Sequence, residues 1–162
     1  MTENYFKLLD LPLNLLIDHN ELKKNYNLLV KASSHDPVLG KGKDDRQKLN
    51  LLARAYTTLC DRIGRIEHLL AIQGLAVAND NRPPNYFAQV DQRLKDILPK
   101  FGQQQKKYSH AVKEIHREVT RGFSQISLEL TELEKLWDEE KSPAVLKKLR
   151  RKSAAFNYIK KH

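Results

Sequence analysis

Cysteine, long apolar runs and targeting signals are scarce in this sequence of 162 residues, and each shortage narrows the possible function. Cys60 is the single cysteine, so an internal disulfide is impossible and a reducing compartment is expected. No stretch approaches the roughly 18 uncharged apolar residues that a membrane span needs. The first residues also lack the basic start and apolar run of a secretory signal. These shortages together predict a cytoplasmic protein.

Residue patterns for catalysis or metal binding are missing as well. The six histidines are scattered, and no Glu-x-x-His pair indicates a carboxylate-bridged metal site. His110 and Glu114 lie one helical turn apart, but two ligands do not define a site. Cys60 has no recognisable base, and residues 40–43 lack the spacing of a phosphate-binding P-loop. We therefore expect no enzymatic activity, no cofactor and no bound metal.

Basic side chains outnumber acidic ones, giving a net charge of +9. Residues 147–161 are rich in Lys and Arg and contain no acid. Such a cluster attracts acidic proteins or phosphate, which leaves open a basic helical protein that binds nucleic acid. A solvated helix face explains the same cluster, and no recognition-helix motif or stacking aromatic residues accompany it.

The apolar residues repeat at helical spacing along the whole chain, and no segment alternates as a strand would. The first residues predict a short helix that ends before Pro12, because proline cannot continue a helix. Asp18 and Glu21 match a capping box that opens a second helix. A loop over residues 33–43 separates it from a third helix, so the two should pack antiparallel. The predicted core positions of these two helices are Leu22, Tyr26, Leu29, Val30, Leu49, Leu52, Ala53, Tyr56 and Leu59.

A fourth helix and a bundle beyond it complete the predicted all-α fold. Gly74 suits the end of the fourth helix, and the Asn- and Pro-rich segment 76–84 is typical of a linker. A periodic apolar stripe over residues 108–137 predicts one long amphipathic helix. Ser142 and Pro143 suit the cap and the first position of a last helix. We thus predict a hairpin domain over residues 1–75, a linker over 76–84 and a three-helix bundle over 85–162.

Three segments are more specific than this helix pattern. Residues 4–12 read Asn-Tyr-Phe-Lys-Leu-Leu-Asp-Leu-Pro, residues 52–59 read Leu-Ala-Arg-Ala-Tyr-Thr-Thr-Leu, and residues 62–74 contain Arg-Ile-Glu-His-Leu-Leu. In order and spacing they resemble the Tyr-Phe-x-Leu-[Phe/Leu]-x-Leu-Pro, Asn-x-Ala-[Trp/Tyr]-x-Thr-Leu and Arg-Ala-Glu-[Tyr/His]-Leu-Leu motifs of HscB-type J-domain co-chaperones. The likeness covers nearly the whole chain, and it implies a J domain followed by a helical bundle.

The resemblance also implies a function and the residues that carry it. In that family the J domain binds a DnaK-class ATPase chaperone, HscA, and the C-terminal bundle holds the iron–sulfur scaffold protein IscU. The chain would then be a co-chaperone that presents a scaffold protein to the ATPase during iron–sulfur cluster assembly. Its chaperone-binding residues would be Lys23, Lys24, Lys31, His35, Asp36 and Pro37, and its scaffold-binding residues would be Phe87, Val90 and Asp91.

The sequence departs from the family pattern in two places. J domains act through a His-Pro-Asp tripeptide, whereas residues 34–37 read Ser-His-Asp-Pro. Because proline fixes φ and restricts the residue before it, its place after Asp36 should change where that carboxylate points. Leu94 and Lys95 also replace acidic residues of the scaffold-binding face. Two hypotheses stay open: an HscB-like co-chaperone with an altered loop, or a diverged J-like interaction protein that no longer stimulates a chaperone.

Overall fold

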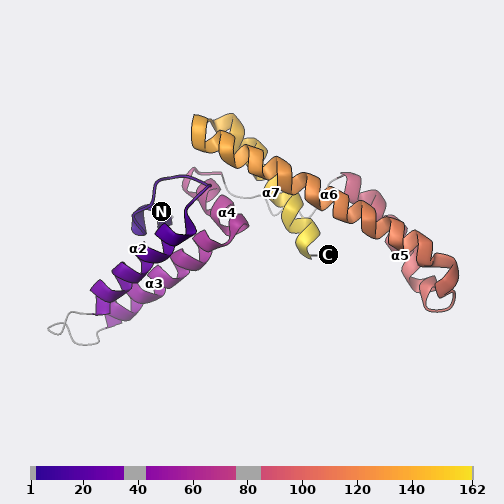
Figure 1. Cartoon of the computed structure of the whole chain (residues 1–162), viewed down its shortest axis with the longest axis horizontal. Helices are drawn as coiled ribbons and strands as arrows, with labels where there is room; N and C mark the ends of the chain where they lie inside the picture. Colours follow the sequence, from indigo (N-terminus) through magenta and orange to yellow (C-terminus); the bar gives the residue numbers. More distant parts are fainter. Residues whose placement is uncertain (1–2, 35–42, 76–84, 162) are drawn as a thin grey trace. The chain divides into compact units, whose positions relative to one another are not determined.

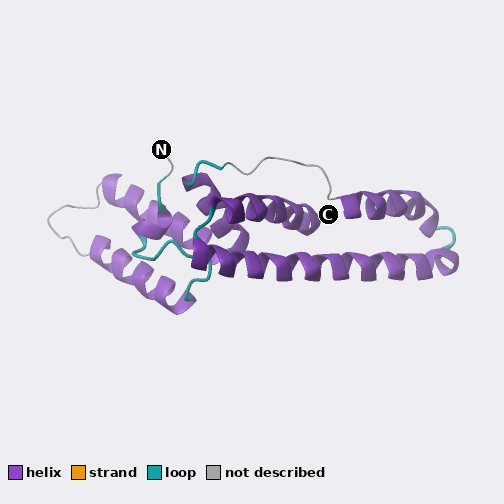
Figure 2. Ribbon diagram, turned by 90° about the horizontal axis from the view of Figure 1, so that it is seen from above, coloured by secondary structure: helices purple, strands orange, loops and turns teal. Residues whose placement is uncertain are grey.

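The structure, a computed structural model, describes residues 3–34, 43–75 and 85–161. Within these ranges the chain forms helices and no strand, which confirms the predicted all-α fold (Figure 1 and Figure 2). Of the predicted loop 33–43, residues 35–42 lie outside the described residues, as does the predicted linker 76–84. The predicted bounds of the loop are too wide, because residues 33 and 34 belong to the second helix and Lys43 begins the third. The helices are α1 (Tyr5–Leu8), α2 (His19–Ser34), α3 (Lys43–Cys60), α4 (Arg62–Ile72), α5 (Asn85–Phe101), α6 (Gln105–Glu140) and α7 (Pro143–Lys161).

Local side chains set where two of these helices begin. Asp18 precedes α2, and its carboxylate accepts a hydrogen bond from the Asn20 backbone N–H at 2.8 Å. Ser142 precedes α7, and its hydroxyl accepts from the Ala144 N–H at 3.3 Å. Each side chain thereby satisfies a backbone donor that has no partner inside its helix. Both predicted helix starts are confirmed.

Gly74 ends α4 through its backbone conformation. Its φ of 72° lies in the left-handed region, which only glycine adopts without strain. The Gly74 N–H donates to the Ala71 carbonyl at 3.1 Å, and the Leu75 N–H donates to the Leu70 carbonyl at 2.8 Å. These two bonds form a Schellman cap, so the predicted end of the fourth helix is confirmed.

Helices α2 and α3 lie side by side as an antiparallel hairpin (Figure 1), as predicted. Leu22 is fully buried, and Tyr26 of α2 stacks on Tyr56 of α3 with ring centroids 4.5 Å apart. Ala55 is also fully buried, whereas Ala53, predicted in the core, is exposed. Each residue turns a helix by about 100°, so a position beside the core stripe leaves the core. The prediction for Ala53 is therefore wrong.

The chain divides into two compact units. The first unit contains residues 1–77 and 133–150, and the second unit contains residues 78–132 and 151–162. Helices α6 and α7 each contribute to both units, and the segment 133–150 that joins them groups with the hairpin. The predicted division instead placed all of residues 85–162 in one bundle, and as a division into domains it stays a prediction.

Asp138, near the end of α6, fixes the segment that leads into α2 within the first unit. Its Oδ1 accepts from the Leu15 N–H at 2.7 Å, and its Oδ2 accepts from the Leu16 N–H at 2.8 Å. Lys141 Nζ donates to the Leu13 carbonyl at 2.9 Å. Charge-assisted hydrogen bonds are roughly twice as strong as neutral ones. The end of α6 therefore holds residues 13–16 in place.

A buried ionic cluster joins α6 to α4 in the same unit. Glu134 is 2% exposed, and its Oε1 and Oε2 accept from Arg62 Nε at 3.0 Å and from Arg62 Nη2 at 2.6 Å. Arg65, 6% exposed, donates to the Leu59 carbonyl at 2.6 Å. Burial lowers the pKa of Arg65, and the nearby charge of Glu134 acts in the opposite direction. The carboxylate thus compensates two cations that the fold has largely removed from water.

Candidate partner-binding surfaces

Three lysines form an exposed basic face on α2, which we call the α2 lysine face: Lys23, Lys24 and Lys31. Leu22, the residue before them, is fully buried, so Lys23 and Lys24 turn away from the core. Lys31 follows them by seven and eight residues, which places it two helical turns further along the same side. Such a face suits contact with an acidic surface.

The loop part of the predicted chaperone site lies outside the described residues. This applies to His35, Asp36 and Pro37. The helices on either side are described, since α2 ends at Ser34 and α3 begins at Lys43. The structure therefore places the hairpin that holds the loop, and the role of the three loop residues stays a prediction.

The three predicted scaffold contacts lie on α5 and differ in exposure. Phe87 and Val90 are 6% and 4% exposed, so their side chains serve the packing of the second unit. Asp91 is half-buried and accepts a hydrogen bond from Lys95 Nζ at 2.6 Å. This hydrogen bond raises the pKa of Lys95. Because Lys95 compensates the carboxylate locally, this part of α5 presents little net charge.

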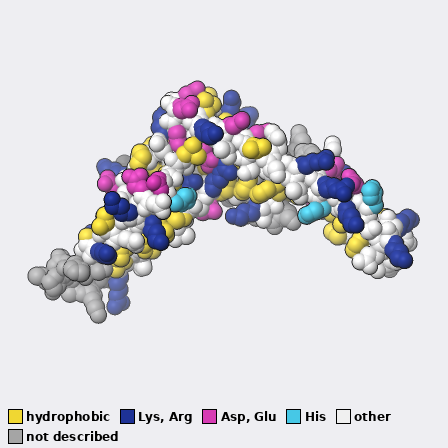
Figure 3. Space-filling view, viewed as in Figure 1, with side chains coloured by type: hydrophobic (Ala, Val, Ile, Leu, Met, Phe, Trp, Pro, Cys, Tyr) yellow, Lys and Arg dark blue, Asp and Glu magenta, His cyan; other side chains and the backbone are white. Residues whose placement is uncertain are grey.

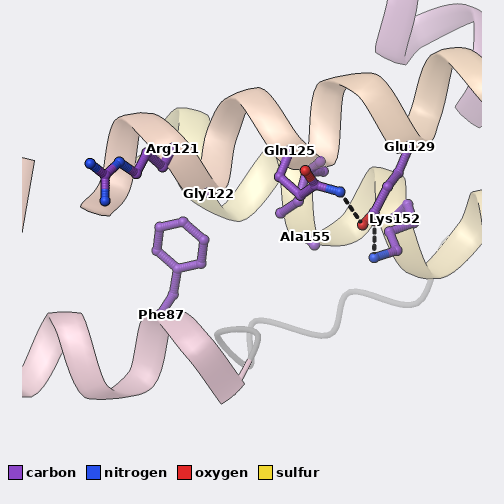
Figure 4. Close-up of a pocket in the computed structure, with 8 residues that line it drawn as sticks. Phe87, Arg121, Gly122, Gln125, Glu129, Lys152 and Ala155 are labelled. Carbon is purple, nitrogen blue, oxygen red and sulfur yellow. Dashed lines mark hydrogen bonds and ion pairs between the residues drawn. The ribbon is translucent and has the colours of Figure 1, made fainter. Parts of the chain in front are cut away.

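A pocket of ≈ 480 Å³ lies beside Phe87 in the second unit (Figure 4). Figure 4 shows the Phe87 ring extending from α5 toward α6, with Lys152 on α7 reaching Glu129. Gln125 also donates to Glu129 at 3.0 Å. Hydrogen bonds from Lys152 and then Gln125 lower the pKa of Glu129. The lining residues are Phe87, Arg121, Gly122, Gln125, Ile126, Glu129, Lys152 and Ala155. Apolar walls with a few polar groups suit an apolar anchor of a partner.

His68 of α4 joins the N-terminal segment to the hairpin unit. Its Nε2 accepts a hydrogen bond from the Tyr5 N–H at 3.0 Å, and the two rings stack with centroids 4.2 Å apart. A ring nitrogen that accepts belongs to a neutral imidazole, which carries its proton on Nδ1. Burial of His68 lowers its pKa, because the charged form loses solvation.

Acidification should therefore weaken the first unit through His68. With the folded pKa below the ordinary value of about 6.5, the unfolded chain binds the proton more readily. The contribution of neutral His68 to the free energy of unfolding is fully present above about pH 6.5. As the pH decreases below that value, the free energy of unfolding decreases by at most about 1.4 kcal/mol per pH unit. Urea unfolding of the wild type and of His68→Gln at pH 7.5 and 5.5 measures this, since glutamine can accept the same bond without titrating. An equal loss in both proteins would contradict the role of His68.

No protein-family model matches the chain. The co-chaperone protein HscB of Proteus mirabilis (strain HI4320) is 28% identical over 85 residues, covering 49% of this chain and 48% of that protein. The match thus spans about half the length of this curated relative.

Two solved structures share the fold over almost the whole chain. The crystal structure of human co-chaperone protein HscB superposes with a TM-score of 0.65 at 15% identity, covering 99% of this chain and 78% of that one. Chaperone HscB from Vibrio cholerae superposes with a TM-score of 0.60 at 18% identity, covering 98% and 92%. The chain is thus similar to HscB in sequence over about half its length and in fold over almost all of it. The resemblance drawn from residues 4–12, 52–59 and 62–74 is therefore confirmed.

The HscB-like relatives are named as chaperones or co-chaperones and not as enzymes, which agrees with the prediction that this chain catalyses no reaction. Among the described residues, no group of three or more His, Cys, Asp or Glu side chains could hold a metal ion. Glu114 pairs with Arg117, and His110 is exposed. Cys60 is partly exposed, and its hydrogen bond with the Tyr56 hydroxyl raises the pKa of Tyr56. Within the described ranges, no helix is long and apolar enough to cross a membrane.

Neither the pocket nor the long-range hydrogen bonds of the first unit could be predicted from the sequence. Glu134 and Asp138 are the carboxylates that join residues 133–150 to α4 and to the segment before α2. Gln125 and Lys152 are the polar residues that hold Glu129 at the pocket. All of these residues read as solvated helix positions, and no local signal distinguishes them.

Proposed function

We propose that this chain is a co-chaperone that binds an IscU-like iron–sulfur scaffold protein and presents it to an HscA-like, DnaK-class ATPase in the cytoplasm. The exposed α2 lysine face on a J-like hairpin, in an HscB-like chain, is the observation that carries the proposal. The names of the similar proteins, co-chaperone and chaperone HscB, support it.

The proposed contacts are divided between two parts of the chain. The α2 lysine face, with His35, Asp36 and Pro37 in the following loop, contacts an acidic surface of the ATPase through complementary charge. The exposed part of α5 around Asp91, with the pocket beside Phe87, receives the scaffold protein. In this proposal residues 1–75 act as the J-like domain, 76–84 as the linker and 85–162 as the scaffold-binding domain.

Neutralising the α2 lysine face should weaken coupling to the ATPase. We expect the wild type to stimulate ATP hydrolysis by the cognate chaperone, measured in single-turnover assays with the scaffold protein present. The triple variant Lys23→Gln, Lys24→Gln, Lys31→Gln should need roughly tenfold more protein for half-maximal stimulation, because three exposed ion pairs of about 0.5 kcal/mol each are lost. Scaffold binding, measured by calorimetry, should not change in this variant.

The matched control carries the same change in net charge at another place. Lys106→Gln, Lys113→Gln and Arg117→Gln remove three exposed cations from α6 and should leave stimulation unchanged. Equal effects of the two triple variants would assign the loss to net charge instead of the α2 lysine face. Absence of both stimulation and scaffold binding in the wild type would rule out the proposed function.

The order of residues 34–37 supports an alternative, a J-like interaction protein without chaperone stimulation. The variant Ser34→His, His35→Pro, Pro37→Ala restores a His-Pro-Asp tripeptide with Asp36 in place. Stimulation by the wild type at the level of this variant favours the co-chaperone. Stimulation that appears only after the repair favours the alternative.

A further inference from the structure

A stripe of exposed basic residues runs along the first half of α6. Figure 3 shows Lys and Arg in dark blue and His in cyan over α5 and this part of α6, with some acidic and hydrophobic side chains among them. The stripe residues are three or four positions apart, so they lie on one side of the helix. We call this the basic stripe, and its members are Lys106, His110, Lys113, Arg117 and Arg121, all exposed.

Except for Arg121, which also lines the pocket beside Phe87, the basic stripe faces away from the core of the second unit. Ile115, on the opposite side of α6, is 2% exposed. Glu114 pairs with Arg117, whose side chain nevertheless stays 63% exposed. Glu118 lies off the stripe and accepts from Arg93 of α5 at 2.6 Å. The stripe therefore presents four permanent cations and a histidine, with the carboxylates of Glu114 and Glu118 beside it.

The side chains of the stripe indicate which class of partner it suits. Specific protein interfaces are centred on large apolar or aromatic side chains. Residues 106–121 are all described, and none of them has a large apolar side chain that is exposed. The exposed large apolar side chains in the described part of this unit are Leu98 on α5 and, beyond the stripe on α6, Phe123 and Leu128. Proteins that bind single strands stack successive bases on several aromatic rings, and the stripe has no Phe, Tyr or Trp and only the single imidazole of His110.

Duplex nucleic acid meets these conditions, because its regular phosphates are bound through charge alone. We propose that the basic stripe binds the phosphate backbone of duplex nucleic acid without reading its sequence. Lys106 and Arg121 are fifteen positions apart on α6, which is about 22 Å of helix or the rise of roughly six to seven base pairs. This site differs from the α2 lysine face, which lies in the first unit, and it goes beyond the proposed co-chaperone function.

Salt-dependent binding to a labelled 20-base-pair DNA duplex tests the proposal. Fluorescence anisotropy between 50 and 200 mM NaCl measures the association constant for the duplex. The slope of its logarithm against the logarithm of the salt concentration should be about −3.6, since each of four cations contributes about −0.9. The dissociation constant at physiological salt should fall between about 10⁻⁴ and 10⁻⁶ M. In Lys106→Gln, Lys113→Gln, Arg117→Gln the slope should shrink toward about −0.9, and affinity should fall at least roughly tenfold.

The α2 triple variant Lys23→Gln, Lys24→Gln, Lys31→Gln is the matched control, because its net charge changes equally. It should keep the wild-type slope for the duplex while losing ATPase coupling, so failure of the two proposals can be told apart. Circular dichroism establishes that both variants are folded. Equal loss of duplex binding in both variants would overturn the proposal in favour of a net-charge effect. Tighter binding of wild type to a 20-nucleotide thymidine strand or to polyglutamate than to the duplex would overturn it in favour of those partners.

Discussion

Glutamine in place of Glu134 is expected to lower the free energy of unfolding by about 3–5 kcal/mol. The carboxylate is 2% exposed and accepts two hydrogen bonds from Arg62, at 3.0 and 2.6 Å. Burial already lowers the pKa of Arg65, and the charge of Glu134 opposes that shift. A neutral amide leaves two largely buried guanidinium groups without the negative charge that faces them. Urea unfolding followed by far-UV circular dichroism measures the loss, provided that the slope of the transition is unchanged.

The matched control is an ion pair of the same chemistry at the surface. Arg93 Nη1 lies 2.6 Å from Glu118 Oε2, and the two side chains are 46% and 38% exposed. Exposed pairs contribute about 0–1 kcal/mol, so Glu118→Gln should change the free energy of unfolding by less than about 1 kcal/mol. A similar small effect of Glu134→Gln would mean that the cluster between α4 and α6 is open to solvent.

The helices could be predicted from the sequence because their signals are local. Asp18 and Ser142 each satisfy a backbone donor two residues further along the chain. The cap of α4 needs only the φ of Gly74 and two backbone hydrogen bonds within residues 70–75. The error at Ala53 has a different origin that is not local, since the buried face of α3 depends on which side α2 packs against. Periodicity alone does not determine that side.

The ties of the first unit could not be predicted, because they join residues far apart in the chain. Arg62 and Glu134 are 72 positions apart, and Leu15 and Asp138 are 123 apart. A carboxylate on a long amphipathic helix has the same sequence pattern whether it meets water or a backbone N–H. The apolar stripe of α6 likewise indicates that the helix packs against another segment, but it does not indicate which segment that is.

The candidate binding surfaces were predictable to different degrees. The α2 lysine face follows from helical spacing, and the structure leaves Lys23, Lys24 and Lys31 exposed. For Phe87 and Val90, spacing predicts an apolar face but cannot separate a partner contact from a core position, and the structure buries both side chains. The pocket requires α5, α6 and α7 together, so no single segment of the sequence carries its pattern.

Alanine in place of Trp137 is expected to cost about 3–5 kcal/mol of unfolding free energy. The side chain is 2% exposed in the first unit, between Glu134 and Asp138 on α6. Within the described residues its indole Nε1 is buried without a hydrogen-bond partner. Lys141 Nζ lies 5.4 Å from the ring centroid, a contact that phenylalanine can also make. Trp137→Phe keeps most of the apolar surface and removes the unsatisfied donor, so it should cost less than about 1.5 kcal/mol.

Both free energies are measured by far-UV circular dichroism during urea unfolding. Tryptophan fluorescence cannot be used, because Trp137 is the single tryptophan and neither variant retains one. The comparison also tests how the chain divides. If residues 133–150 pack with the hairpin, the cost of Trp137→Ala falls on the transition of the first unit, together with that of Glu134→Gln. The two losses should then fall short of additivity, because neighbouring side chains share contacts. A cost below about 1 kcal/mol for Trp137→Ala would contradict this packing and favour the division at residues 76–84 that the sequence predicts.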